Sequence, residues 1–304
     1  MADILLQLDE TILPGIANAI KDKTGKTDAL PLTQFAAEIE SISGGSGGGS
    51  EDLEAFKKAV IARTITEISM SDVATLGDYA FGFCTSLSSA SFPACTNICT
   101  NVFFKCSNLS SFSASLCTTI GNFAFGYCTN LSSVDFPECT TIGSYAFSGC
   151  TNLSSVDFPE CTSIGSITFG KCTSLTNVSL PKCTTMGSYA FSGCTSLTNV
   201  NLTKCTITEG YAFYGCTSLT SINLPACKTI GQYAFMSCYS LMSLRLGYAS
   251  LVALSNKNAF MNTPMSNSTY TGVFGSIYVP ASLVASYKTA ANWSYYSSRI
   301  TAIV

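Results

Sequence analysis

The fold is decided by the stretch from Leu131 to Asn152, which reads L-S-S-V-D-F-P-E-C-T-T-I-G-S-Y-A-F-S-G-C-T-N. The same pattern begins again at Leu153, and this spacing of 22 residues recurs from about residue 65 to about residue 250. Fifteen of the sixteen cysteines follow it, because each stands eleven residues after the previous one from Cys84 to Cys238. Only Cys99 departs from the series. A fixed period without insertions indicates a tandem array in which each unit stacks on its neighbours.

Each unit predicts one strand followed by a return segment. Leu131, Val134 and Phe136 are apolar, whereas Ser133 and Asp135 are polar, so the strand has an inner and an outer side. A single unit cannot bury both the strand residues and the apolar residues of the return segment. Stacking at roughly 4.8 Å per strand would bury both, and nine or ten coils would give a parallel sheet of about 40 to 50 Å. The apolar column of the return segment is Phe81, Phe103, Phe125, Phe147, Phe169, Phe191, Phe213 and Phe235.

The unit matches the leucine-rich-repeat pattern L-x-x-L-x-L-x-x-N/C-x-L, with Cys139 at the N/C position. In the form I-G-x-Y-A-F-x-G-C-T-x-L-x-x-V-x-F-P it resembles the BspA-like leucine-rich repeats of bacterial surface proteins, over residues 65 to about 280. The predicted fold class is therefore an α/β repeat solenoid. It is a right-handed coil with a parallel β-sheet on the concave face, helical caps and a small helical N-terminal segment. The resemblance implies adhesion, or binding of host or matrix proteins, without catalysis.

Five regions are predicted along the chain. Ile12, Ile16 and Ile20 recur at helical spacing, and a glycine- and serine-rich stretch follows this first segment. Residues 12–42 and the C-terminal sequence resemble flanks of tail-associated proteins of phages and prophages from gut bacteria. The predicted regions are a helical attachment segment (1–42), a Gly/Ser linker (43–50), an N-terminal capping helix (51–64), the solenoid (65–280) and a C-terminal cap (281–304).

The ends of the array carry two further predictions. An irregular insertion is expected from Ser255 to Gly275. Ser282 to Ala290 is expected to form a second capping helix, with Leu283, Tyr287 and Trp293 facing the last coil. Residues 1–42 are too few to fold alone, so we expect them to dock on a copy of the chain or on a larger assembly.

Composition excludes several classes of function. From residue 64 onward there are nine Lys/Arg and eight Asp/Glu, a net charge of +1, which gives no footprint for nucleic acid. No run of 18 apolar residues predicts membrane insertion. The first residues lack the features of a secretory signal peptide. We expect an extracellular location, on a bacterial cell surface or a virion, with a stay in the cytoplasm until release as the alternative.

The cysteines are expected to be reduced and buried. Neighbours in one column would lie about 5 Å apart, but pairing along a uniform column would impose the same strained geometry at every step. Disulfide pairing stays as the alternative. Cys95 and Cys99 form the only pair off the period, and without histidine or further converging thiolates they predict no zinc site. No metal and no cofactor are expected.

The outward strand positions are the candidate binding face. Small hydroxyls, amides and two neighbouring carboxylates, without an aromatic platform, indicate a hydrogen-bonding surface for a protein or a glycan. Plain solvation of an exposed sheet is the alternative. The candidate residues are Ser133, Asp135, Ser155, Asp157, Asn177, Ser179, Asn199, Asn201, Ser221, Asn223 and Arg245.

The predicted function is non-catalytic binding or adhesion at a cell surface, and the alternative is a structural spacer or tail component without its own ligand. Without histidine there is no Ser-His or Cys-His pair. Asp135 and Asp157 would lie roughly 5 Å apart, as in retaining glycosidases, but equivalent positions on an open sheet do not separate their pKa values. Contact through the 255–275 insertion is also open. So is the role of a tyrosine column, which could stack sugars or pack along the coil edge: Tyr79, Tyr145, Tyr189, Tyr211 and Tyr233.

Overall fold

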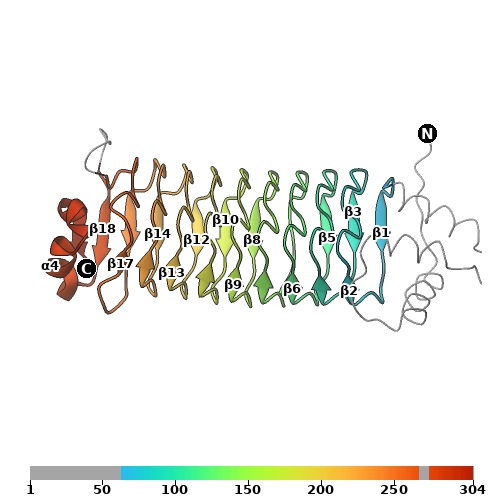
Figure 1. Ribbon diagram of the computed structural model, residues 1–304, viewed down its shortest axis with the longest axis horizontal. Coiled ribbons are helices and arrows are strands. Elements are labelled where there is room, and N and C mark those ends of the chain that lie inside the picture. Colours follow the sequence, from blue (N-terminus) through green and yellow to red (C-terminus); the bar gives the residue numbers. More distant parts are fainter. Residues whose placement is uncertain (1–62, 267–273, 304) are drawn as a thin grey trace, which may run out of the picture.

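Successive coils stack along the long axis of the molecule, and each coil brings two strands into parallel pairing (Figure 1). The computed structural model describes residues 63–266 and 274–303. The attachment segment, the linker and all but the last two residues of the predicted N-terminal capping helix lie outside the described residues. The solenoid predicted for the repeat region is confirmed.

Three-residue strands form one side of the solenoid, which we name the long-strand face. They pair in parallel within three sheets, and most partners are 22 residues apart, as Asn177 is from Asn199. The coil of Leu131 contributes only a bridge between Ser113 and Asp135. The strands are β1 (Glu67–Ser69), β3 (Ser89–Ser91), β5 (Ser111–Ser113), β8 (Ser155–Asp157), β10 (Asn177–Ser179), β12 (Asn199–Asn201), β14 (Ser221–Asn223), β16 (Ser243–Arg245), β18 (Ser276–Val279) and β19 (Ile300–Ala302).

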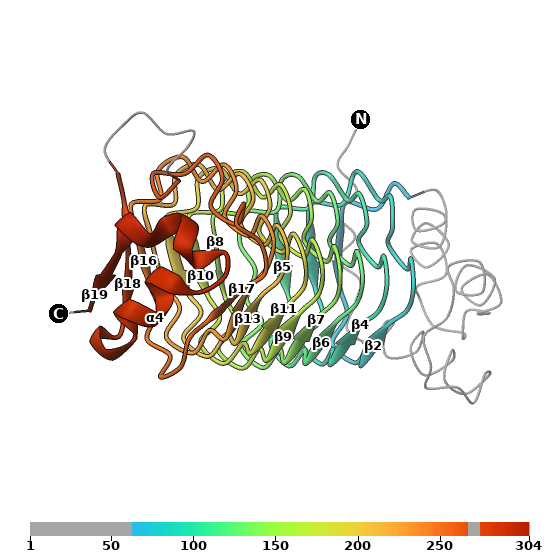
Figure 2. The ribbon, with the colours of Figure 1, turned by 60° about the vertical axis from the view of Figure 1, so that its left-hand side comes forward.

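A second row of strands, which the sequence analysis missed, forms the short-strand face (Figure 2). These nine strands make one continuous parallel sheet. Each has only two residues, which is too short for a recognisable alternation of apolar and polar residues. They are β2 (Thr75–Leu76), β4 (Asn97–Ile98), β6 (Thr119–Ile120), β7 (Thr141–Ile142), β9 (Ser163–Ile164), β11 (Thr185–Met186), β13 (Ile207–Thr208), β15 (Thr229–Ile230) and β17 (Ala253–Leu254).

A column of stacked phenylalanine rings runs through the core. From Phe81 to Phe260, neighbouring rings have centroids 5.2–5.4 Å apart and planes within 13° of parallel. All of them are buried. Burial of each ring contributes about 1.5–3 kcal/mol to folding, and offset stacking adds to this. The predicted column is therefore confirmed, and it is one ring longer than predicted.

That extra ring corrects the prediction for residues 255–275. The backbone amide of Phe235 donates to the Ala259 carbonyl at 2.9 Å, and that of Ser237 donates to Met261 at 2.9 Å. The first part of the expected insertion is therefore a further coil. Its cysteine position is occupied by Thr263, so the cysteine ladder did not reveal it.

The turn segment, from Gly143 to Cys150 and its equivalents, connects the short-strand face back to the next long strand. In this coil Tyr145 and Gly149 have φ of 59° and 75°, and the amides of Tyr145 and Phe147 donate to the next coil at 2.9 Å. The left-handed conformation at two positions per coil lets alternate amides point along the solenoid axis. Successive turn segments thus pair as regularly as the strands do.

Hydroxyl groups add a further set of bonds between coils. Thr140 Oγ1 donates to the Thr118 carbonyl at 3.1 Å, and Ser154 Oγ donates to the Ser132 carbonyl at 3.3 Å. Each belongs to a row in which every Ser or Thr bonds to the residue 22 positions earlier. Much of the Ser and Thr content therefore holds coils in register.

The cysteine thiols also donate to backbone carbonyls. In one column the thiol reaches a phenylalanine carbonyl 25 residues earlier, at 3.0–3.2 Å, as Cys150 does to Phe125. In the other it reaches the carbonyl two residues later, at 3.2–3.4 Å, as Cys139 does to Thr141. All sixteen are free thiols, and all except the half-buried Cys99 are buried. They act as small apolar side chains with a weak donor.

The C-terminal residues cover the last coil. They comprise a 3₁₀ turn η1 (Ala281–Leu283), helix α4 (Val284–Thr289) and a second 3₁₀ segment η2 (Trp293–Arg299). The amide of Val252 donates to the Tyr287 hydroxyl at 3.0 Å, and Trp293 Nε1 donates to the Val252 carbonyl at 2.7 Å. Tyr287 and Trp293 are buried against the last coil as predicted, although the helix is shorter than predicted.

Replacing Gly165 with alanine is expected to destabilise the solenoid by about 1–3 kcal/mol or more. A Cβ at this position would lie 2.4 Å from the backbone nitrogen of Ser144, and backbone cannot move aside cheaply. Gly210→Ala is the matched control, since its nearest atoms would be 3.5 Å away. Urea unfolding of the two variants measures the difference. Equal midpoints would show that the coils are not packed as closely as described.

Alkaline pH is expected to unfold the protein steeply. Burial raises the pKa of the Cys84, Cys95, Cys183 and Cys227 thiols from 9.0 to about 11. Because the folded pKa lies above the unfolded one, this stability is complete below pH 9.0 and is lost as pH rises toward about 11. Each thiol removes about 1.4 kcal/mol per pH unit.

The measurement is the free energy of unfolding against pH in the presence of a reductant. The variant Cys183→Ala with Cys227→Ala should show a slope shallower by about 2.8 kcal/mol per pH unit over this range, whatever its absolute stability. An unchanged slope would mean that these thiols titrate normally in the folded chain.

Candidate binding face

The outward positions of the long strands carry the predicted polar side chains. The central residue of each strand is buried and its two neighbours point outward, as in β8, where Val156 lies between exposed Ser155 and Asp157. All eleven predicted residues are exposed except Ser179, which is half-buried. The period-2 prediction of their orientation is confirmed.

The middle of this face is hollowed. A hollow of about 620 Å³ extends over strands β8, β10, β12 and β14, and we name it the long-strand hollow. Its floor is formed by Val156, Val178, Val200 and Ile222, and Thr198 lies at its edge; none of these five was predicted. Three predicted residues, Ser133, Asp135 and Arg245, lie outside it. The predicted residues that line it are Ser155, Asp157, Asn177, Ser179, Asn199, Asn201, Ser221 and Asn223.

Charge in and around the hollow is graded along the solenoid axis. Among the lining residues Asp157 is the only ionisable one. Asp135 lies one coil before it, and Arg245 lies in register one coil beyond Asn223. The face therefore passes from carboxylates through neutral amides to a guanidinium. Such an order suits a ligand with hydrogen-bonding groups along its length and opposite charges at its two ends.

Two asparagines of the hollow are oriented by hydrogen bonds. Asn199 Nδ2 donates to Asn177 Oδ1 at 2.7 Å, and Asn177 Nδ2 donates to Thr176 Oγ1 at 2.7 Å. In the described parts of the chain, the side chains of Asp157, Asn201 and Asn223 have no protein partner. The neighbouring hydroxyls of Ser154, Thr176 and Thr198, by contrast, all bond to the preceding coil. Polar groups that hold the coils together are thus separate from those that face outward.

The tyrosine column packs ring against ring. Tyr189 and Tyr211 have centroids 4.5 Å apart and planes within 3°, and Tyr211 stacks on Tyr233 at 4.9 Å. Their faces are therefore covered by one another, which favours packing over sugar stacking for this column. Ile167 interrupts it, so that Tyr145 stacks on Phe123 at 4.4 Å instead.

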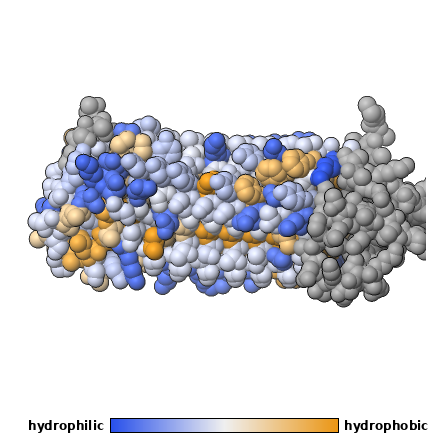
Figure 3. Space-filling view, in the orientation of Figure 1, coloured by the Kyte–Doolittle hydropathy of each residue, from blue (hydrophilic) through white to orange (hydrophobic). Residues whose placement is uncertain are grey.

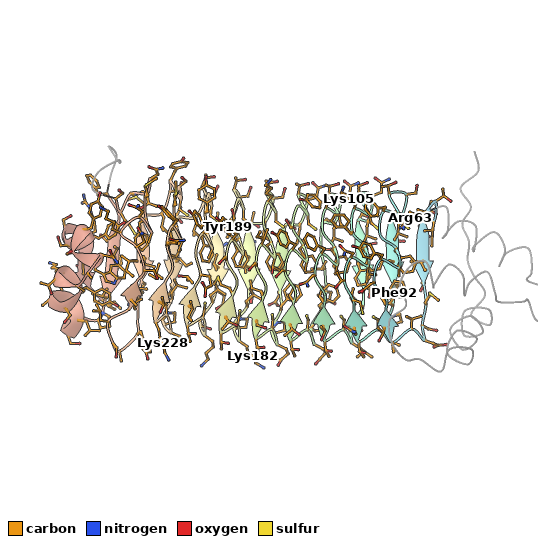
Figure 4. The ribbon with its side chains drawn as sticks, viewed as in Figure 1. Arg63, Phe92, Lys105, Lys182, Tyr189 and Lys228 are labelled. Atoms are coloured by element: carbon orange, nitrogen blue, oxygen red, sulfur yellow. The ribbon has the colours of Figure 1, made fainter. Side chains whose placement is uncertain are left out.

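A second exposed cluster combines aromatic and basic residues at the N-terminal coils (Figures 3 and 4). Phe104 meets Phe83 edge-on at 5.4 Å and Tyr127 at 5.8 Å. Lys105 Nζ lies 5.6 Å from the Phe83 centroid, and Arg63 approaches the same ring at 5.7 Å. Sequence analysis missed this cluster because it occupies positions at which the repeat unit varies.

Comparison with known proteins places the chain in a family. The family model for the BspA type leucine rich repeat region matches residues 54–173 and 162–279, with six copies of its unit. The chain belongs to this family. Proteins with this leucine-rich repeat are typically surface-associated and non-enzymatic, and they generally serve as protein-binding scaffolds.

Solved leucine-rich-repeat structures share the fold. A leucine-rich repeat protein of T. pallidum is 26% identical, with a TM-score of 0.44, over 58% of this chain and 77% of that one. One from Bacteroides ovatus is 20% identical, with a TM-score of 0.30, over 80% of this chain and 85% of that one. One from Eubacterium ventriosum is 16% identical, with a TM-score of 0.36, over 71% and 86%. No curated protein matches the sequence.

Two further searches concern metals and membranes. Within residues 63–266 and 274–303, His, Cys, Asp and Glu side chains nowhere gather in threes or more as a metal site requires. None of the helices in those ranges has the length and apolar character needed to cross a bilayer.

Replacing Ile167 with tyrosine is expected to stabilise this leucine-rich-repeat chain by about 0.5–1.5 kcal/mol. Ile167 has φ of 58°, a conformation that disfavours a β-branched residue, and a ring there would stack between Tyr145 and Tyr189. Ile167→Ala removes the branching without adding a ring. Urea midpoints that rank tyrosine above alanine would support stacking, whereas the reverse order would refute it.

Proposed function

We propose that the chain is a non-catalytic binding protein that recognises a protein or a glycan on a cell surface through the long-strand hollow. The observation that carries this proposal is the contrast between the two sets of polar groups. Ser154, Thr176 and Thr198 bond within the protein, whereas Asp157 and Asn201 line a hollow without a protein partner. Groups that only kept the sheet in register would be satisfied internally.

The shape of the hollow supports a ligand that runs along the solenoid. Outward residues repeat once per coil, at about 4.8 Å, so a ligand lying along the axis would meet a fresh hydroxyl or amide at every coil. The buried floor of Val156, Val178 and Ile222 offers no acceptor, so specificity rests on the polar walls. An extended peptide or a glycan chain fits this arrangement, and the adhesion proposed for the family's resemblance would follow from it.

Location and origin belong to the same proposal. We infer an extracellular site of action, on a bacterial surface or a virion of the gut, from the resemblance of the flanking sequences. Residues 1–42 would attach the solenoid to a copy of itself or to a larger assembly. The alternative is a rigid spacer without its own ligand, and the uninterrupted inter-coil bonding of the stack favours that alternative on mechanical grounds.

The test is capture of glycan arrays and of whole gut bacterial cells by the full chain. Asn201→Lys with Asn223→Lys should weaken capture at least about tenfold, because long charged side chains would fill the hollow. Thr141→Lys with Thr185→Lys adds the same charge to the short-strand face and should change affinity by less than about twofold. Equal effects of both pairs would place recognition elsewhere. No capture by the unaltered chain would favour the spacer.

A further inference from the structure

A row of exposed side chains follows the corner between the two strands of each coil. Residues three before and three after each corner are held in strand register at 22 residues, so corner side chains of successive coils are neighbours. Figure 4 shows one of them, Lys182, at the edge of the solenoid and directed away from it. We name this the corner row, and its central members are Leu116, Glu138, Glu160, Lys182, Lys204 and Ala226.

The order of charges in the corner row does not suit an isolated chain. Lys182 Nζ contacts both carboxylate oxygens of Glu160 at 2.6 Å. The other contacts along the row bring like charges together, Glu138 beside Glu160 and Lys182 beside Lys204. Like charges on neighbouring strands are destabilising, and alternating signs would give three favourable pairs instead of one.

The same order is self-complementary when two copies run in opposite directions. With the twofold axis between the coils of Glu160 and Lys182, Glu160 meets Lys182 and Glu138 meets Lys204 of the second copy. Leu116, which is 53% exposed, meets Ala226. Four pairs of opposite charge and two apolar pairs form, and no like charges oppose each other. A parallel arrangement would instead place every glutamate against a glutamate.

We propose that two copies of this chain associate side by side and antiparallel through the corner row. An isologous contact of this kind requires a self-complementary surface, which the charge order supplies. It also fixes the axial register, because a slip by one coil sets Glu160 against Glu160 or Lys182 against Lys182. Each exposed ion pair contributes little alone, so the association is weak, reversible and sensitive to salt.

The neighbouring rows agree with this arrangement. The twofold axis lies across the two solenoids, so their long-strand faces adjoin along one edge. Asp157 would then lie opposite Ser179, and Asp135 opposite Asn201, again without like charges. The association does not depend on the proposed function. If that function holds, however, the dimer would present two hollows on one side, and a multivalent surface would be bound with avidity.

Sedimentation velocity of the full chain tests the proposal. Self-association should weaken at least about tenfold between about 0.01 M and about 1 M salt, as the screening length falls from roughly 30 Å to roughly 3 Å. Two variants make the row uniform: Glu138→Lys with Glu160→Lys gives four lysines, and Lys182→Glu with Lys204→Glu gives four glutamates. Each alone should remain monomeric at low salt, and a one-to-one mixture should form a heterodimer.

The control carries an equal change of net charge away from the row. Lys171→Glu with Lys257→Glu alters two exposed lysines and should associate as the unaltered chain does. A monomeric unaltered chain at low salt, association of the four-glutamate variant on its own, or failure of the mixture to pair would each overturn the proposal. Association through residues 1–42 would persist in both uniform variants, and this outcome is thereby distinguished.

Discussion

The register of 22 residues between neighbouring coils is the constraint on which the rest of the structure depends. Because partners such as Asn177 and Asn199 are one period apart, every position of the unit becomes a column along the solenoid. The phenylalanine stack, the thiol bonds and the hydroxyl rows are all consequences of that single spacing. A one-residue insertion within a coil would displace all of them together. The array can accept extra residues only where a loop leaves the stack, as the coil after β17 does between residues 263 and 275.

The sequence predicted the solenoid, the phenylalanine column and the outward direction of the candidate residues, because periodicity carries all three. It did not predict the short-strand face, since two residues such as Thr141 and Ile142 cannot display an alternation. It missed the coil containing Phe260, because Thr263 replaces the cysteine that marked the other units. The left-handed turn positions were hidden for a different reason. Tyr145 and Ile167 are not residues that usually adopt this conformation, and the hydrogen bonds of the stack impose it.

The candidate binding face was predicted only in part for a geometric reason. Alternation assigns Asp157 and Asn201 to the outer side, but it says nothing of depth. The hollow arises from the stacking of four consecutive coils, and its floor consists of core residues such as Val178 that no search for polar patterns would select. The predicted residues at either end, Asp135 and Arg245, share the orientation but not the hollow. They nevertheless contribute the charge gradient along it.

Departures from the repeat separate function from architecture in a chain of this kind. A column position that bonds to the next coil cannot vary without breaking the stack, and Thr140 and Cys150 are examples of such positions. A position that bonds to nothing within the protein is free to differ from coil to coil. The outward row changes from Asp157 to Ser179 to Asn201, and the corner row changes from Glu160 to Lys182. Variation inside an otherwise uniform array is costless to the fold, so the two rows where it is ordered rather than random are where selection for contacts would act. That the two rows flank one edge of the same face is why recognition and self-association can be argued from one register.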